Sequence, residues 1–388
     1  MITAGIVAEY DPFHLGHAWH IAETRRALGP ESAVVCVMSG NWVQRADCAV
    51  ADKWARAALA LEGGADLVLE LPTPWAMSSA ESFARGAVSL LAAPGVVDAL
   101  SFGSEDGTLE GLEQAAAALD APEYPAALKR ELDRGLSFPA ARQAAAGAAC
   151  LATPNNNLGV EYLRALRALN STIKPMTVAR RGAGHDAEGS VEGFASATQI
   201  RKLLRSGDRA GAAELVRPGA LDALGVVSGL EHVERAVLAR LRTMEQADWA
   251  VLPDGGAAEG LPARLEKAAR QAGSLAEFYE LAKTKRYPHA RLRRRALGAF
   301  LGLRAEERLE MPPYVRVLGL DETGRSLLRR MKETCALPVI VKPAQARDLE
   351  GRALGLFQAE ARRTDLYGLC FPTPRPCGAE WTHSPVYR

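Results

Sequence analysis

The chain has 388 residues with a formal net charge of +1, and its 48% hydrophobic content is unlike that of disordered chains. Its six cysteines are scattered without a C-x-x-C pair, which favours reduced thiols over a disulfide framework. No apolar stretch approaches the roughly 20 residues of a membrane span, and the N-terminus lacks the pattern of a secretory leader. We therefore expect a cytoplasmic protein that does not bind a membrane.

The first 205 residues alternate short apolar runs with amphipathic segments. Strands are predicted over 2–8, 33–38, 66–71, 97–102 and 173–178, and helices over 18–28, 52–61, 79–92 and 160–169. This alternation indicates an α/β fold with a Rossmann-like parallel sheet and right-handed crossovers. Ligands of such sheets bind where the carboxyl ends of the strands meet. The polar residues that follow each predicted strand are therefore candidates for a site.

The turn at residues 11–17, with the sequence DPFHLGH, joins the first predicted strand to the first predicted helix. Helix N-termini attract phosphate through free N–H groups and a partial positive charge. Gly16 has no Cβ, so a phosphate can approach the backbone closely. His14 and His17 can then donate hydrogen bonds to the same phosphoryl oxygens, each donor lowering the barrier of nucleotidyl transfer by roughly 3–4 kcal/mol. We interpret both histidines as catalytic.

The histidine pair also has two simpler interpretations. Histidines in loops are often only polar surface residues, and His at i and i+3 can share a metal ion. No cysteine cluster and no carboxylate at metal-ligand spacing supports zinc in this segment, so we predict no protein-bound metal there.

Two later segments carry further polar candidates. Asn155 and Asn156 lie in a loop that is expected to cap the helix over 160–169, where their side chains either bind a ligand or serve only as caps. Ser196, Thr198 and Arg201 lie at the start of another helix and form a second phosphate-binding arrangement, with capping by Ser196 alone as the alternative.

From residue 206 the pattern is mostly helical, and we expect a second domain over 206–388. Helices are predicted over 230–242, 262–272 and 275–283. Strands over 314–318 and 337–341, joined by a helix over 323–332, predict a small βαβ unit of this domain. Residues 362–388 are expected to form an irregular tail.

The most basic run of the chain follows the last of these three helices. It contains Lys283, Lys285, Arg286, Arg291, Arg293, Arg294 and Arg295, with Tyr287 among them. A basic run with an aromatic residue suits a phosphate backbone and a stacked base, as in nucleic acid. A solvated helix face is the alternative.

Taken together, these segments resemble the bacterial tRNA(Met) cytidine acetate ligases of the HxGH nucleotidyltransferase superfamily. The resemblance is carried by GIVAEYDPFHLGHAWH at 5–20, MSGNWVQR at 38–45, DKW at 52–54, FGSE at 102–105, PNN at 154–156, SATQIR at 196–201 and KTKRY at 283–287. The HxGH turn alone is typical of the wider superfamily, whereas SGNxVQR and PNN in this order are more specific. The chain departs from the family at Asp11, where Asn is usual, and at Ala46, where Gly is usual.

The resemblance implies a nucleotidyltransferase-like domain over 1–205 and a tRNA-binding domain over 206–388. It implies a ligase that uses ATP and Mg²⁺ to convert acetate to acetyl-adenylate, and then acetylates N4 of the wobble cytidine of elongator tRNA(Met). The basic run would hold the tRNA. The extra carboxylate of Asp11 would repel phosphate unless it is hydrogen-bonded.

The resemblance also implies a set of site residues. The ATP site would be formed by Val7, Ala8, Glu9, Tyr10, Asp11, Pro12, Phe13, His14, Leu15, Gly16, His17, His20, Gly103, Asn155, Asn156 and Arg180, with Ser196, Thr198 and Arg201 at the phosphates. Contacts to acetate or cytidine are expected from Gln44, Arg45 and Lys53.

Two other functions stay open at this point. One is a small-metabolite adenylyltransferase of the same superfamily, which would not need the basic run. The other is a non-catalytic RNA-binding protein that retains an inactive nucleotide fold.

Overall fold

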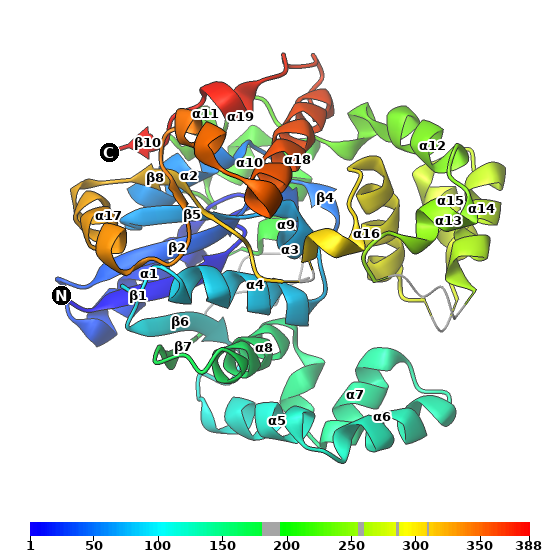
Figure 1. The fold of residues 1–388 in the computed structure, drawn as a ribbon, viewed down its shortest axis with the longest axis horizontal. Helices are drawn as coiled ribbons and strands as arrows, with labels where there is room; N and C mark the ends of the chain where they lie inside the picture. Colours follow the sequence, from blue (N-terminus) through cyan, green and yellow to red (C-terminus); the bar gives the residue numbers. More distant parts are fainter. Residues whose placement is uncertain (181–194, 255–259, 285–286, 309) are drawn as a thin grey trace.

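A computed structural model of the chain describes residues 1–180, 195–254, 260–284, 287–308 and 310–388. In this part of the chain, the central feature is an eight-stranded sheet with the order β10-β8-β5-β2-β1-β6-β7 and β9 paired to β8 (Figure 1). Its parallel strands are β1 (Thr3–Ala8), β2 (Ala33–Ser39), β5 (Leu67–Leu71), β6 (Ala99–Ser104) and β7 (Lys174–Ala179). The predicted α/β class with a Rossmann-like parallel sheet is confirmed.

Helices cover both faces of the sheet because alternate residues of its strands point to opposite sides. Val35 and Val37 of β2 belong to one apolar cluster, and Val34 and Cys36 belong to another. The first cluster is completed by α4 (Ala80–Ala92), α8 (Pro154–Ala168) and α17 (Glu322–Thr334). The second is completed by α1 (Leu15–Leu28), α2 (Lys53–Glu62), α9 (Ala197–Arg205), α10 (Arg209–Ala213) and α11 (Ala220–Leu224). Helices on both sides of residue 205 therefore pack on the same face of the sheet.

The predicted elements of the first half are present, with shifted ends. Helix α1 begins at Leu15, three residues before its predicted start, because His14 caps it. Helix α8 begins at Pro154, so the Pro-Asn-Asn segment is the first turn of the helix and the prediction of a loop there is wrong. Proline is well placed at such a position because its missing N–H has no partner in a first helical turn.

The predicted βαβ unit is present, and its place in the fold differs from the prediction. Strand β8 (Val315–Leu320) pairs with β9 (Val339–Ile340) in parallel, and α17 connects them. On its other side β8 pairs antiparallel with β5, where Val68 lies opposite Gly319. All six residues of β8 are buried, which requires a partner at both strand edges and cover on both faces. The unit therefore completes the main sheet and does not stand in a separate domain.

The C-terminal tail is more regular than predicted. Helix α18 (Gly351–Tyr367) extends through the first residues of the expected irregular segment. It is followed by α19 (Ala379–Thr382) and by β10 (Val386–Tyr387), which joins the edge of β8. The chain thus ends on the sheet with which it begins.

A helical lobe lies at the right in Figure 1. It consists of α12 (Glu234–Arg242), α13 (Gln246–Ala250), α14 (Leu261–Gln271), α15 (Leu275–Ala282) and α16 (His289–Phe300). These helices surround an apolar cluster that includes Trp249, Phe278 and Leu292, and also takes in Trp42 and Tyr367 from outside the lobe. The lobe is therefore joined to the sheet by shared core.

The remaining elements are short or peripheral. The insertion after β6 forms α5 (Glu110–Asp120), α6 (Tyr124–Asp133) and α7 (Phe138–Ala146), which lie lowest in Figure 1. Short elements are β3 (Trp42–Val43), β4 (Asp47–Cys48), α3 (Thr73–Ala76) and the 3₁₀ turns η1 (Ala149–Ala152), η2 (Leu230–His232), η4 (Ala305–Arg308), η5 (Pro343–Asp348) and η6 (Gly368–Cys370). Among the described residues, we find no helix with the length and apolar character of a membrane span.

Candidate active site

A cavity of about 230 Å³ lies at the carboxyl ends of β1, β6 and β7. Of the residues predicted for ATP, its lining includes Val7, Ala8, Glu9, Tyr10, Asp11, His14, Gly16, His17, His20, Gly103, Asn155, Arg180, Ser196 and Arg201. Gln44 and Arg45 also line it. Pro12, Phe13, Leu15, Asn156, Thr198 and Lys53 lie outside its lining. The structure therefore brings most of the predicted residues to one place, at the edge of the sheet where ligands of this fold class bind.

Each of the two histidine rings accepts a hydrogen bond from a backbone amide of the turn at the start of α1. The Gly16 amide donates to Nδ1 of His14 at 3.1 Å, and the His14 amide donates to Nδ1 of His17 at 3.3 Å. The rings stack with 3.7 Å between centroids. A ring nitrogen that accepts a hydrogen bond carries no proton, so each neutral imidazole carries its proton on Nε2. Both side chains therefore keep an Nε2–H group free to donate to a ligand in the cavity.

Burial and nearby guanidinium groups keep these rings neutral. Burial, with Arg180 and Arg201 nearby, lowers the pKa of His14 to about 3. The pKa of His17 is also lowered well below its usual value by burial and by the adjacent His14. Burial lowers the pKa of His20 to about 4. The fixed positive charge of the cavity thus comes from arginines, and the histidines act as neutral hydrogen-bond donors.

This protonation state gives a direct prediction. In nitrogen NMR spectra of the ligand-free protein at pH 6, His14 and His17 should appear as neutral Nε2–H tautomers, because burial lowers the pKa of both rings well below the usual value. Imidazolium signals from these two residues at pH 6 would contradict the assignment.

Below pH 6.5 the unfolded chain binds protons that native His14 does not, so stability is lost as pH falls toward the native pKa. A His14→Gln variant should lose less stability than the parent between pH 7 and pH 5.

Arg180 and Arg201 are held over the cavity from two sides. Arg180 donates from Nη1 to Oδ1 of Asn155 at 2.9 Å. A Cβ at position 103 would lie 3.2 Å from the Arg180 side chain, so Gly103 leaves room for that side chain to cross the end of β6. Arg201 donates from Nη1 to the Asp11 carbonyl at 2.7 Å and from Nη2 to the Thr198 hydroxyl at 3.0 Å. Thr198 therefore orients Arg201 from outside the cavity.

Asn156 has a different place from the one predicted. It is buried, accepts from the Glu105 amide at 2.9 Å and donates to Asp106 at 3.0 Å. The Glu105 carboxylate accepts from the backbone amides of Asn155 and Asn156, which places it at the N-terminus of α8. Those contacts lower the pKa of Glu105 against the effect of partial burial. Asn156 thus fixes the loop after β6, and Asn155 faces the cavity.

Three of the other predicted residues belong to the core or to the turn itself. Phe13 packs in the apolar cluster beneath α2, where a Cβ on Gly63 would overlap its ring. Leu15 is the first residue of α1, and Pro12 precedes Phe13 in the turn. These residues shape the turn and do not line the cavity.

The two carboxylates of the cavity wall, Asp11 and Glu9, each accept a hydrogen bond from a backbone amide. Asp11 accepts from the Val50 amide at 2.7 Å and lies 3.6 Å from Arg201. The Asp11 carboxylate is thus hydrogen-bonded, which is the condition under which a nearby phosphate was expected to be tolerated. Glu9 accepts from the Gln44 amide at 2.6 Å, and burial raises the pKa of Glu9. That bond fixes the Gln44–Arg45 segment against the end of β1.

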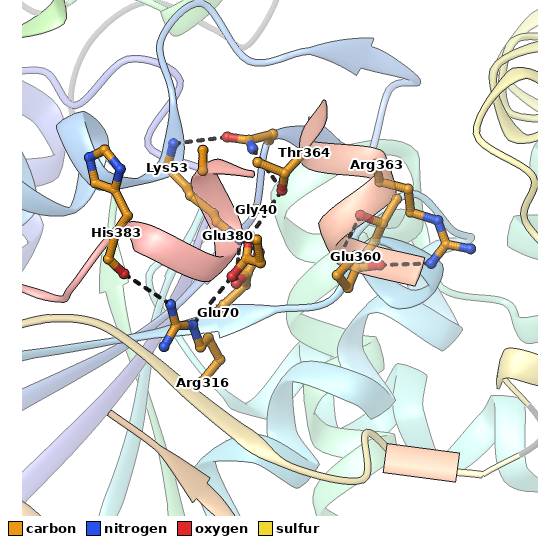
Figure 2. Close-up of polar contacts among 12 residues, drawn as sticks. Gly40, Lys53, Glu70, Arg316, Glu360, Arg363, Thr364, Glu380 and His383 are labelled. Atoms are coloured by element: carbon orange, nitrogen blue, oxygen red, sulfur yellow. Dashed lines mark hydrogen bonds and ion pairs between the residues drawn. The ribbon is translucent and has the colours of Figure 1, made fainter. Parts of the chain in front are cut away.

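The prediction that Lys53 contacts acetate or cytidine is wrong. Lys53 is 1% exposed, and its Nζ lies 2.7 and 2.8 Å from the two carboxylate oxygens of Glu70. It also binds Glu380, which pairs with Arg316 and accepts from Thr364 (Figure 2). Two opposite charges, from Glu70 and Glu380, therefore enclose this lysine. The nearest signal in the sequence is Glu70 at the end of β5, whereas Glu380 lies 327 residues away.

The same C-terminal elements anchor the segment that carries Gln44 and Arg45. Asn41 accepts from the Lys53 amide at 2.9 Å and donates to Thr364 at 3.4 Å. The Trp42 indole donates to the Arg363 carbonyl at 3.1 Å, and the Tyr367 hydroxyl donates to the Ala49 carbonyl at 2.8 Å. Much of the SGNxVQR segment is thus buried against α18. The partners of this segment on α18 could not be recognised in the sequence, because they lie more than 300 residues further along the chain.

The basic run is divided between core and surface. Arg295 is 2% exposed and donates to the carbonyls of Leu252 and Pro253, so the prediction that it binds tRNA is wrong. Tyr287 is buried in the core of the helical lobe and cannot stack on a base. The remaining described members, Lys283, Arg291, Arg293 and Arg294, are at least partly exposed. Lys285 and Arg286 lie outside the described residues.

The polar groups of the cavity suit a nucleoside triphosphate. It combines two neutral imidazole donors, two guanidinium groups and the hydroxyl of Ser196, which caps α9 by accepting from the Gln199 amide at 3.2 Å. Fixed donors of this kind stabilise charge that develops on a phosphoryl group during attack. In the described part of the chain, no group of three or more His, Cys, Asp or Glu side chains could hold a metal ion.

Comparison with known proteins agrees with this geometry. Residues 1–379 match the family model described as HIGH Nucleotidyl Transferase. The chain is 34% identical over 417 residues to the tRNA(Met) cytidine acetate ligase of Acetivibrio thermocellus, with 99% of each chain covered. It is 37% identical over 392 residues to the protein of that name from Caldanaerobacter subterraneus subsp. tengcongensis, with 96% of each covered.

Solved structures show the same likeness in three dimensions. The crystal structure of Thermotoga maritima TmcAL bound with alpha-thio ATP has a TM-score of 0.90, and the apo structure has a TM-score of 0.92. Both are 32% identical in sequence and cover 100% of this chain and 99% of theirs. The turn, the fold and the near-complete coverage lead to one conclusion: the chain belongs to the HIGH nucleotidyl transferase family and, within it, to the tRNA(Met) cytidine acetate ligases.

Proposed function

We propose that this protein is an ATP-dependent ligase that forms acetyl-adenylate and acetylates N4 of the wobble cytidine of elongator tRNA(Met). The observation that carries the proposal is the pair of neutral imidazoles at the end of β1, facing a cavity that also holds Arg180 and Arg201. The names of the full-length relatives support the reaction, and the alpha-thio ATP bound by the Thermotoga relative supports the nucleotide. A substrate tRNA is consistent with a cytoplasmic location.

The first step joins acetate to the α-phosphate. An acetate oxygen attacks the α-phosphorus, a P–O bond forms, and the bond to the β-phosphate breaks as pyrophosphate leaves. Acetate is a weak nucleophile, so the protein must hold it in line with the leaving group. The Nε2–H groups of His14 and His17 donate to the charged phosphoryl oxygens, and Arg180 and Arg201 bind the rest of the triphosphate. Ser196 at the start of α9 adds a further contact to phosphate.

The second step transfers the acetyl group to RNA. The cytidine N4 attacks the acetyl carbonyl carbon, a C–N bond forms, N4 releases one proton, and the C–O bond to AMP breaks. Gln44 and Arg45 line the cavity and are the proposed contacts to acetate or to the cytidine. The hydrogen bond from the Gln44 amide to Glu9 keeps this pair next to the end of β1.

Magnesium would accompany the triphosphate. Mg²⁺ keeps several waters and binds through substrate phosphates together with one or two carboxylates. Among the described residues, Glu9 and Asp11 are the carboxylates of the cavity wall, and each already accepts a backbone hydrogen bond. Glu9 and Asp11 are thus the residues that would help to hold the ion beside the substrate phosphates, and a bound ion would supply neutralisation of phosphate charge.

The tRNA would lie across the basic residues of the helical lobe that are at least partly exposed. Lys283, Arg291, Arg293 and Arg294 are the described residues proposed for this role, and Lys285 and Arg286 are proposed from the sequence alone. Binding through phosphates would make the affinity fall with salt concentration.

The test is mass analysis of tRNA nucleosides after incubation of the protein with ATP, labelled acetate and elongator tRNA(Met). We expect label at N4 of the wobble cytidine, with AMP and pyrophosphate released together. Unlabelled cytidine beside intact ATP would contradict the proposal. Acetate-independent use of ATP with another small substrate, without any tRNA product, would favour a small-metabolite adenylyltransferase.

A further inference from the structure

Two arginines from different parts of the fold meet at Asp47, two residues beyond Arg45 of the cavity wall. Arg205, the last residue of α9, places Nη1 and Nη2 3.2 Å from Oδ2 of Asp47. Arg293 of α16 places Nη2 3.8 Å from the same oxygen. It also donates from that nitrogen to the Ala46 carbonyl at 3.3 Å. Helix α9 and the helical lobe therefore each present a guanidinium group to one carboxylate, two residues beyond a residue of the cavity lining.

This cluster opens to solvent and carries excess positive charge. The Arg205 and Arg293 side chains are 31% and 30% exposed, and Asp47 between them is 16% exposed. One carboxylate is thus shared by two guanidinium groups, and Arg45 nearby is exposed as well. Asp47 pairs with both groups, and each arginine side chain stays partly exposed to solvent. Guanidinium groups that are oriented in this way suit the oxygens of a phosphate.

An aromatic ring lies beside the cluster. Tyr279 of α15 is partly exposed, and burial raises its pKa to about 12, with the charges of Arg293 and Asp47 close enough to act on it. Its ring contacts the exposed His289 edge-on, with 5.1 Å between centroids. Lys283 follows one turn later at the end of α15 and is exposed. Tyr287, the aromatic residue predicted to stack on a base, is buried, whereas Tyr279 contacts His289, one helical turn before Arg293 on α16.

We propose that Arg205, Arg293 and Tyr279 form the binding site for the single-stranded stretch of RNA that flanks the reacting cytidine. The two arginines hold a backbone phosphate and Tyr279 stacks on a neighbouring base. The inference rests on the proposed function and deepens it. A base that enters the cavity carries its flanking phosphates past Arg45 of the lining, and Asp47, which pairs with both arginines, follows Arg45 by two residues. Single-stranded RNA is bound by this combination of cationic groups and aromatic faces.

The experiment measures binding of elongator tRNA(Met) over a range of salt concentrations for the parent and for Arg205→Gln, Arg205→Lys, Tyr279→Ala and Tyr279→Phe. Arg205→Gln should weaken binding and lower the slope of log Kd against log salt by about 0.7 for the lost phosphate contact. Arg205→Lys should keep most of the slope. Tyr279→Ala should weaken binding about fivefold or more, and Tyr279→Phe should bind nearly as well as the parent.

Two controls separate this inference from the proposed function. Arg330→Ala removes an exposed arginine from α17, which lies at the opposite side of the molecule from α16 in Figure 1, and should leave tRNA binding unchanged. Acetate-dependent exchange of pyrophosphate into ATP, without tRNA, reports the first step alone. If the parent lacks this exchange, the proposed function fails. If the exchange is normal and Arg205→Gln binds tRNA with the slope of Arg330→Ala, the inference is overturned.

Discussion

Replacing His17 with Ala is expected to slow acetate-dependent formation of acetyl-adenylate by about 100- to 1000-fold, which is the usual effect of losing one fixed donor to a developing oxyanion. The reason is specific to the geometry. His17 accepts the His14 amide through Nδ1, so its remaining Nε2–H is aimed at a ligand and needs no rearrangement during attack. The measurement is the rate of pyrophosphate exchange into ATP in the presence of acetate.

Two comparisons keep this result interpretable. His232→Ala changes a partly exposed histidine of η2, outside the cavity, and should react at the parental rate. The His17 ring also contacts Tyr10 at 4.8 Å between centroids, so thermal unfolding of His17→Ala must be measured beside its activity. A folded His17→Ala protein that exchanges pyrophosphate at full speed would refute the role of the pair.

Replacing Lys53 with Ala is expected to lower the free energy of unfolding by about 3–5 kcal/mol, because removal of one partner leaves buried charges uncompensated. Glu70 and Glu380 are 5% and 2% exposed in their side chains, and both lose their lysine. Denaturation in urea at pH 8 measures the effect. In the parent, burial already raises the pKa of Glu70 to about 7, although Lys53 acts to lower it. Without Lys53, the native carboxylates bind protons more readily, so the loss of stability should shrink as pH falls from 8 toward 6.

The matched control is an exposed ion pair. Arg134→Ala removes the partner of Glu131 on α6, where the arginine side chain is 72% exposed, and should change stability by less than about 1 kcal/mol. The double variant Lys53→Met with Glu380→Gln removes one positive and one negative charge from the buried network. It should be more stable than Lys53→Ala. A Lys53→Ala protein as stable as Arg134→Ala would show that the network does not hold the C-terminal elements on the sheet.

The turn between β1 and α1 could be predicted because its signals are local. An apolar run, two histidines around a glycine and an amphipathic helix lie within 30 residues, and the structure keeps them in that order. The sequence also placed Asp11 and Arg201 near phosphate, and the bond from Arg201 to the Asp11 carbonyl shows that they are neighbours. The order of strand, turn and helix and the proximity of Asp11 and Arg201 therefore agree with the prediction, while binding of phosphate there stays a prediction.

The errors come from partners that are distant in sequence. Lys53 lies in a motif, which suggested a ligand contact, yet its charge is used by Glu70 and Glu380 in the core. Arg295 lies in a basic run, yet the rotation of α16 points it at the carbonyls of Leu252 and Pro253, whereas Arg293 faces Asp47. A single sequence does not show which face of a helix will be covered. Strand β8 was assigned to a second domain because its partner β5 is distant in sequence. The pairing of β8 with β5 spans about two-thirds of the chain.

The central claim is that acetate attacks the α-phosphate of ATP in the cavity at the end of β1, and its most direct test uses acetate labelled with oxygen-18. If acetyl-adenylate forms and cytidine then attacks the acetyl carbon, one acetate oxygen remains on the phosphate of AMP. We therefore predict that the AMP released during tRNA acetylation carries one oxygen-18 atom. Unlabelled AMP, or label in the released pyrophosphate, would contradict the claim.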